Sequence, residues 1–269
     1  MSLACGFDPG LNARWRQAVD AHKAHAHAAW PEEAVGLVLA DDTYHACRNV
    51  APEPTETFAI DPSELLSACD ARPAAVLHSH PSGREPETGA MLPPLDCPSS
   101  SDMRGQMDLG VPWGISLCLE TGASDPFWFG DAVPRPPLIG RTFRHGVDDC
   151  YSLVRDWHRE AAGIHLLDFP RDPDWWEHGG TLYDGFAEAG FARVHRPDDQ
   201  PVPGDCFICT VRSSVPNHAG VYLGDGLILH HLCHQLSVRQ PASVWRTKMH
   251  FLVRHRDLPE DAVLPAIEA

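Results

Sequence analysis

The chain has 269 residues, 43% hydrophobic and 22% charged, with a formal net charge of -16 at pH 7. The apolar and charged fractions are those of a folded globular protein rather than a disordered chain. The negative net charge argues against unspecific binding to nucleic acid or anionic membranes, because its electrostatic field repels both. Without an apolar run of membrane-spanning length or a basic-then-apolar N-terminus, we expect no membrane span and no signal peptide, and we expect the nine scattered cysteines to be reduced thiols of a protein made in a cytoplasm.

The first part of the chain is expected to combine helices with a sheet. Apolar residues at helical spacing predict a helix over 11–29, with His22, His25 and His27 at a solvated helix end rather than in a metal site. Asp61 and Pro62 suit the start of a further helix. Short apolar runs typical of strands occupy residues 35–40, 43–48, 74–80 and 113–119.

Prolines and glycines, which interrupt helices and strands, are concentrated in two stretches of the chain. Residues 82–98 contain four prolines and two glycines without periodicity, and we expect a loop there. The stretch 133–137 is proline-rich, and consecutive prolines stiffen a connection, so we place a domain boundary near residue 135. The expected domains are residues 1–133 and 134–269.

The second part is expected to begin with a helix behind Asp149 and to continue as a sheet. A second helix is predicted over 181–189, ending at Gly190. Gly224 to Gly226 predict a tight hairpin turn between two strands. The expected strands cover residues 205–211, 219–223, 227–231 and 249–254.

Two pairs of residues in this part carry weaker signals. Cys206 and Cys209 match a C-x-x-C pattern, but on a strand they point to opposite faces, so we interpret both as structural. Trp175 and Trp176 favour packing within the domain, with an exposed sugar or partner platform as the alternative.

A group of metal-ligating residues marks the first domain. His78 and His80 end an apolar strand, and residues two apart on a strand point to the same side, so both rings can reach one cation. Asp102 begins a helix-like segment and can supply a third, oxygen ligand, which leaves an open position on a catalytic zinc. Glu33 is placed to be the base, and Ser99 to donate a hydrogen bond to an oxyanion.

These residues resemble the JAMM (MPN-type, Mov34-like) metalloprotease motif over residues 10–130: a Glu, then His78-Ser79-His80-Pro81, then Ser-x-x-Asp. The resemblance implies an α/β/α sheet domain in which Zn2+ is bound by His78, His80 and Asp102, with Glu33 as general base and Ser99 as oxyanion helper. Residues 82–98 make the spacing longer than is usual, and that loop is expected to gate substrate entry or to block the site.

A second group indicates a thiol peptidase. Cys150 stands at the start of a helix, where the helix dipole favours the thiolate. His218 can serve as its base and His230 as the group that orients the base. A buried structural cysteine is the alternative for Cys150, and the spacing of the three residues argues against it.

The pattern Asp149-Cys150, then His218-Ala-Gly-Val-Tyr-Leu-Gly, then His230 resembles the NlpC/P60 cell-wall peptidases over residues 138–256. The resemblance implies a papain-like domain with Cys150 as nucleophile. Tyr151 and Ser152 replace the Ser or Thr and the Gly that usually follow the nucleophile.

The two halves together resemble the tail tip assembly proteins of lambda-like phages. This resemblance implies an α+β chain at the virion tail tip, made in the host bacterial cytoplasm. It also implies tail hub and tail tip proteins as partners and peptidoglycan stem peptides as substrate, without nucleic acid. The hypotheses left open are a murein endopeptidase, a maturation protease acting through the zinc half, and a structural adaptor with little activity.

Overall fold

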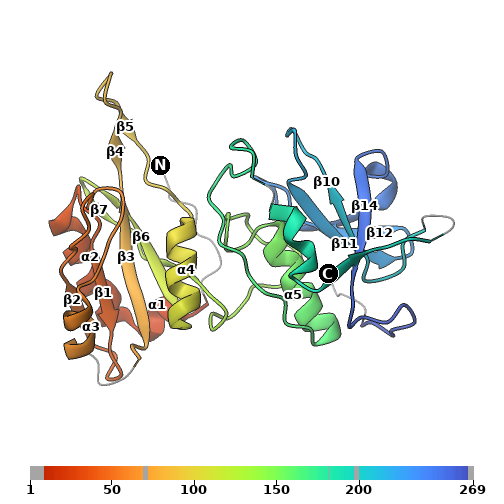
Figure 1. The fold of residues 1–269 in the computed structure, drawn as a ribbon. Coiled ribbons are helices and arrows are strands. Elements are labelled where there is room, and N and C mark those ends of the chain that lie inside the picture. Colours follow the sequence, from red (N-terminus) through yellow and green to blue (C-terminus); the bar gives the residue numbers. More distant parts are fainter. Residues whose placement is uncertain (1–8, 69–71, 181, 197–199, 266–269) are drawn as a thin grey trace. The chain divides into compact units, whose positions relative to one another are not determined.

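The computed structural model describes residues 9–68, 72–180, 182–196 and 200–265. The chain divides into two compact units, Met1–Arg135 and Pro136–Ala269, and each unit contains its own six-stranded sheet (Figure 1). The expected mixture of helices and sheets is therefore confirmed. Among the described residues no helix is long and apolar enough to cross a bilayer.

The first unit is built on a mixed sheet of strand order β2-β1-β3-β6-β7, in which β8 also pairs with β6. Strands β3 and β6 run parallel, and the other pairs of this sheet are antiparallel. In chain order the elements are α1 (Leu11–Arg14), α2 (Arg16–Ala29), β1 (Val35–Val38), β2 (Tyr44–Cys47), α3 (Pro62–Ala68), β3 (Ala75–Pro81), β4 (Gly83–Arg84), β5 (Met91–Leu92), α4 (Ser100–Leu109), β6 (Trp113–Leu119), β7 (Gly122–Ala123) and β8 (Phe127–Phe129).

Alternation along β3 gives its two faces different roles. Leu77 packs with Val19 of α2 in an apolar core on one face. His78 points to the opposite face, where its ring centroid lies 5.7 Å from that of Trp113. Gly105 of α4 closely approaches Trp113, so α4 covers this second face. The strand therefore places polar side chains between the sheet and α4 while its other side anchors the core.

The segment expected to be a plain loop contains a small hairpin. Strands β4 and β5 pair antiparallel, with Gly83 opposite Leu92 and Arg84 opposite Met91. The prediction of no regular structure over 82–98 was wrong at these four residues, because backbone pairing across a turn needs no periodic side-chain pattern.

The second unit contains an antiparallel sheet of order β13-β12-β11-β10-β14-β9, and α5 packs against β11. One sheet face carries a core that includes Leu153 and Trp157 of α5, and the other carries a cluster around Trp245. The elements are α5 (Cys150–Ala162), η1 (Leu182–Ala187), β9 (Phe191–Arg193), β10 (Cys206–Cys209), β11 (His218–Gly224), β12 (Leu227–His230), β13 (Val238–Pro241), η2 (Ala242–Val244) and β14 (Met249–His255).

Local sequence signals in this unit had mixed outcomes. Asp225 and Gly226 form the expected tight turn, with φ values of 51° and 71°. Cys206 and Cys209 are buried free thiols in clusters on opposite sheet faces, as predicted. The helix expected over 181–189 is instead the short 3-10 segment η1, since Gly185 weakens a helix at its centre, and Thr181 lies outside the described residues.

Candidate functional site

The helix that begins with Cys150 is fixed at its first turn by Asp149. Asp149 is the residue that caps α5, and its Oδ1 accepts a hydrogen bond from the backbone N–H of Ser152 at 2.8 Å. Its Oδ2 accepts a second bond from the N–H of Gly146 at 2.9 Å. One carboxylate therefore satisfies an open helix donor and also ties down the preceding turn.

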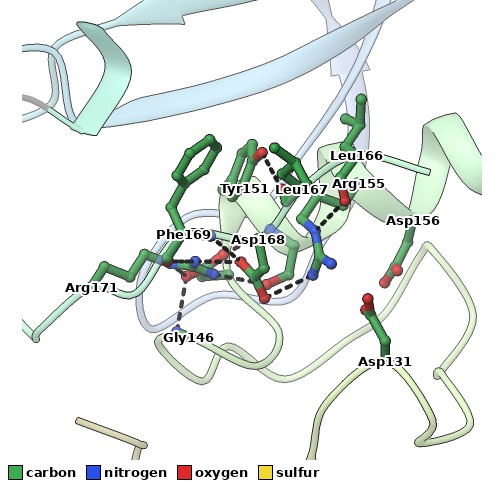
Figure 2. A network of polar contacts seen from close by, with 12 residues as sticks. Asp131, Gly146, Tyr151, Arg155, Asp156, Leu166, Leu167, Asp168, Phe169 and Arg171 are labelled. Atoms are coloured by element: carbon green, nitrogen blue, oxygen red, sulfur yellow. Dashed lines mark hydrogen bonds and ion pairs between the residues drawn. The ribbon is translucent and has the colours of Figure 1, made fainter. Parts of the chain in front are cut away.

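Asp149 is held in place by Arg171, which belongs to a network of ion pairs with Asp168 and Arg155 (Figure 2). Arg171 donates from Nε to Asp149 Oδ2 at 2.7 Å and from Nη1 to Asp168 Oδ1 at 2.8 Å. Arg155 binds the other oxygen of Asp168, also at 2.8 Å. Although burial alone would raise the pKa of Asp149, Arg171 holds that pKa well below its ordinary value. The charge that positions the helix is thus permanent at neutral pH.

The thiol of Cys150 is half-buried and lies against a phenol. Its Sγ is 3.2 Å from Oη of Tyr183, and the backbone N–H of Ala219, next to His218, also points to it. Burial, reinforced by the charge of Asp149, raises the pKa of Cys150 to about 11, although the bond to Tyr183 opposes the rise. In this arrangement the resting thiol is protonated, so a base must remove its proton.

Two buried histidines on adjacent strands form a chain with a glutamine. His218 opens β11 and His230 ends β12, and Nε2 of His218 lies 3.2 Å from Nδ1 of His230. The amide of Gln240, on β13, contacts Nε2 of His230. Burial lowers the pKa of His218 to about 3 and that of His230 to about 4, so both rings are neutral at pH 7.

Which nitrogen of His218 can act depends on how the amide of Gln240 is turned, because Nε2 of Gln240 faces Nε2 of His230 in the structure. A side-chain amide can present its oxygen or its nitrogen by a half-turn. With the oxygen of Gln240 toward Nε2–H of His230, Nδ1 of His230 accepts the proton from Nε2–H of His218. Nδ1 of His218 then carries a free lone pair, which is what a base for a protonated thiol requires.

The three ligands expected in the first unit converge. Nε2 of His78 and Nε2 of His80 lie 3.3 Å apart, and each is 3.3 Å from an oxygen of Asp102. Tetrahedral zinc with ligand atoms at about 2.0–2.1 Å places them roughly 3.3–3.4 Å from one another. The donor set therefore fits a zinc ion in both chemistry and spacing.

Neighbouring backbone and histidine contacts hold these ligands. Nδ1 of His80 lies 2.8 Å from the carbonyl oxygen of Leu95, a contact that directs Nε2 toward the cluster. His22 is fully buried, with Nε2 3.2 Å from the carbonyl oxygen of His78 and Nδ1 3.1 Å from the hydroxyl of Tyr44. The expectation that His22 belongs to a solvated helix end was wrong.

Glu33 and Ser99 line the same cavity of about 200 Å³ as His80 and Asp102. Burial raises the pKa of Glu33 to about 7, against the opposing effect of His80. Ser99 caps α4, accepting from the N–H of Asp102 at 3.1 Å and donating its hydroxyl proton to Oδ2 of Asp102 at 2.7 Å. In this arrangement Ser99 orients a ligand, and donation to an oxyanion would need a change of partner.

Several residues at the two sites carried no clear sequence signal. Tyr183 and Gln240 stand in segments without a motif, and residues 55–57 line the cavity beside Glu33 and Asp102 from an irregular stretch. His22 did have a signal, because it follows Ala18 and Val19 by four and three residues and so shares their buried helix face. Trp175 is partly buried against the core of its unit, as favoured, and its ring contacts Tyr183.

Comparison with known proteins gives consistent matches. Residues 135–254 match the NlpC/P60 family. The chain is 42% identical to tail tip assembly protein K of Escherichia phage lambda over 184 residues, which is 68% of this chain and 81% of that protein. It is 32% identical to tail tip assembly protein K of Escherichia phage N15 over 252 residues, covering 90% and 96% of the two chains. The chain belongs to the tail tip assembly protein K family.

Replacing Arg171 by Met should destabilise the second unit by about 3–5 kcal/mol, because Asp149 would remain buried without its charged partner. Chemical denaturation of the whole chain measures the change. Arg246→Met, at an exposed position of the same unit, is the matched control and should be near neutral. Equal effects of the two substitutions would show that the network carries no such role.

The contribution of Asp149 should also depend on pH. Its pKa is lower in the folded than in the unfolded chain, so its stabilisation is present above the unfolded value of about 3.9 and is lost as pH falls below it. The difference in unfolding free energy between the wild type and Asp149→Asn should therefore shrink from pH 7 to pH 3. A difference that grows over this range would contradict the assignment.

Proposed function

We propose that this member of the tail tip assembly protein K family acts at a phage tail tip as a peptidoglycan endopeptidase. The observation that carries the proposal is the thiol of Cys150 against the backbone N–H of Ala219, directly after His218, whose ring is linked to His230 and, through it, to Gln240. The match of residues 135–254 to the NlpC/P60 family supports a cysteine peptidase. Stem peptides of the cell wall are the substrate that this family suggests.

The proposed reaction uses the neutral state of the histidines. His218 takes the proton of Cys150 at Nδ1 while the sulfur attacks the peptide carbonyl, and His230 stabilises the resulting imidazolium through Nε2 of His218. His218 then gives the proton to the leaving amine, and an acyl-enzyme remains. Water activated by His218 hydrolyses the thioester. Because burial keeps the thiol protonated, proton transfer accompanies attack instead of preceding it.

For the first unit we infer a zinc peptidase site of JAMM type. His78, His80 and Asp102 would hold Zn2+, which supplies positive charge to polarise a substrate carbonyl. Glu33 faces the same cavity and would take the proton of the attacking water. The hydroxyl of Ser99 would orient Asp102 and, after a change of partner, stabilise the developing oxyanion.

The location and partners follow from the same family. We place the protein in the virion tail tip, among tail hub and tail tip proteins, after synthesis in the host bacterial cytoplasm. The net charge of -16 suits assembly among proteins better than adsorption to an anionic wall. Delivery by the tail would remove the need for electrostatic attraction to peptidoglycan.

A second candidate function is a maturation protease that cleaves a tail protein through the zinc half. It is favoured by the complete ligand set and by the open cavity beside it. A third is a structural adaptor that keeps both folds with little activity. It is suggested by the long segment over residues 82–98 and by the proline-rich stretch near residue 135.

Cys150→Ala should abolish cleavage of purified muropeptides, because no other group replaces the sulfur nucleophile. Mass spectrometry of the products measures the loss, and a chelator should leave the wild-type rate unchanged. Cys233→Ala, which removes an exposed thiol of the same unit, is the control and should retain activity. Cleavage that survives in Cys150→Ala, or that the chelator stops, would refute the assignment to the second unit.

His78→Ala should change the mass of a tail protein or reduce the yield of tails if the zinc half is a maturation protease, since the substitution removes a ligand. Masses of all virion proteins from phage carrying this substitution provide the measurement. Unchanged masses and yield would exclude the maturation role. Normal infection by Cys150→Ala phage, with tails lost on deletion of the chain, would favour the adaptor instead.

A further inference from the structure

A second cluster of metal-binding side chains lies in the first unit, outside the site described above. His45 and Cys47 are two apart on β2 and therefore point to the same side, toward α3. Glu64 of α3 completes the group, and the ligand atoms of the three residues all lie within 4.8 Å of one another. The strand register places Cys47 opposite Val35, which is itself opposite His78, so two strand spacings separate the clusters.

The polar atoms of this cluster are poised for a ligand. Nε2 of His45 is shielded from solvent and has no hydrogen-bond partner among the described residues, although it lies 3.6 Å from Oε1 of Glu64. The other oxygen of Glu64 accepts from the backbone N–H of Arg48 at 3.3 Å, which directs Oε1 toward the ring. Cys47 is only 3% exposed. Buried polar groups normally have hydrogen-bond or metal partners, so Nε2 of His45 is a candidate ligand atom.

The packing of α3 supplies an independent observation. None of its seven residues is buried, and Leu66 is 78% exposed. A helix of this length is unstable by itself, because nucleation is costly and few bonds follow. Apolar burial does not anchor α3, whereas a bond through Glu64 to β2 would.

We propose that His45, Cys47 and Glu64 bind a structural zinc ion. An imidazole, a thiolate and a carboxylate are all common zinc ligands, and the thiolate favours zinc over magnesium or calcium. Binding releases the proton of Cys47 and joins the edge strand β2 to α3. A water molecule or a further side chain fills the fourth position.

This ion would also secure the wall of the neighbouring cavity. Cys47 and Glu64 bracket residues 48–63, and within that segment Thr55, Glu56 and Thr57 line the cavity that contains Glu33 and Asp102. Closing the two ends of the segment restricts its conformations. The proposed ion therefore shapes the first site without touching its reacting groups, and it does not depend on the activity proposed there.

Cobalt spectroscopy of the full-length protein tests the proposal. Co2+ bound to a thiolate absorbs in the near ultraviolet by charge transfer from sulfur, and the cluster of His78, His80 and Asp102 contains no sulfur. We expect the band in the wild type and in Asp102→Asn, and its loss in Cys47→Ser. Cys118→Ser, which removes another buried thiol of the same sheet, is the control and should keep the band.

Glu64→Gln covers the case in which Cys47→Ser does not fold, since Glu64 is only half-buried. It should weaken cobalt binding at the thiolate site at least about tenfold. Zinc should also protect residues 48–63 from proteolysis in Asp102→Asn but not in Glu64→Gln. The proposal is overturned by cobalt binding without the band in the wild type, by a band that survives Cys47→Ser, or by unchanged affinity in Glu64→Gln.

Discussion

The second unit depends on one buried ion pair between Asp149 and Arg171. Removing two charges from water is costly, and the cost is offset only when each lone pair and each N–H finds a partner. Here the carboxylate of Asp149 meets two backbone N–H groups and the guanidinium, while Arg171 also binds Asp168. Such a pair contributes more to geometry than to net stability, because only one arrangement satisfies it. That arrangement determines where Cys150 lies.

Much of the fold can be predicted from the periodicity of apolar residues in the sequence. The side-chain contacts at the two sites are harder to predict in this way. Strand β6 begins and ends where the apolar run predicts, and a period of two was enough to bring His78 and His80 together. Arg171 and Gln240 had no motif to mark them, since their roles arise from contacts with residues 22 and 10 positions away. Sequence patterns predict which face of a helix or strand a side chain occupies. They do not predict which residue of another segment that side chain contacts in the folded chain.

The buried histidines of the two sites have different electrostatic surroundings. In the second unit burial keeps His218 and His230 neutral, and a shared hydrogen bond aligns them. In the first unit Asp102 lies against both His78 and His80, and its negative charge opposes the effect of burial on each. The hydrogen-bonded pair of His218 and His230 suits proton transfer from one ring to the next. The cluster of His78, His80 and Asp102 suits binding of one metal ion by several donor atoms.

The contact between His80 and Leu95 has a consequence for how this protein can diversify. The acceptor is the main-chain carbonyl of Leu95, so the ring of His80 does not read the identity of that side chain. Met91, Leu92 and Leu95 are each more than two-fifths exposed. Substitutions at these three positions can therefore accumulate while His80 keeps its orientation. A lineage of phages can therefore vary the side chain of Leu95, which lines this cavity, and inherit the arrangement of His80 and Asp102 unchanged.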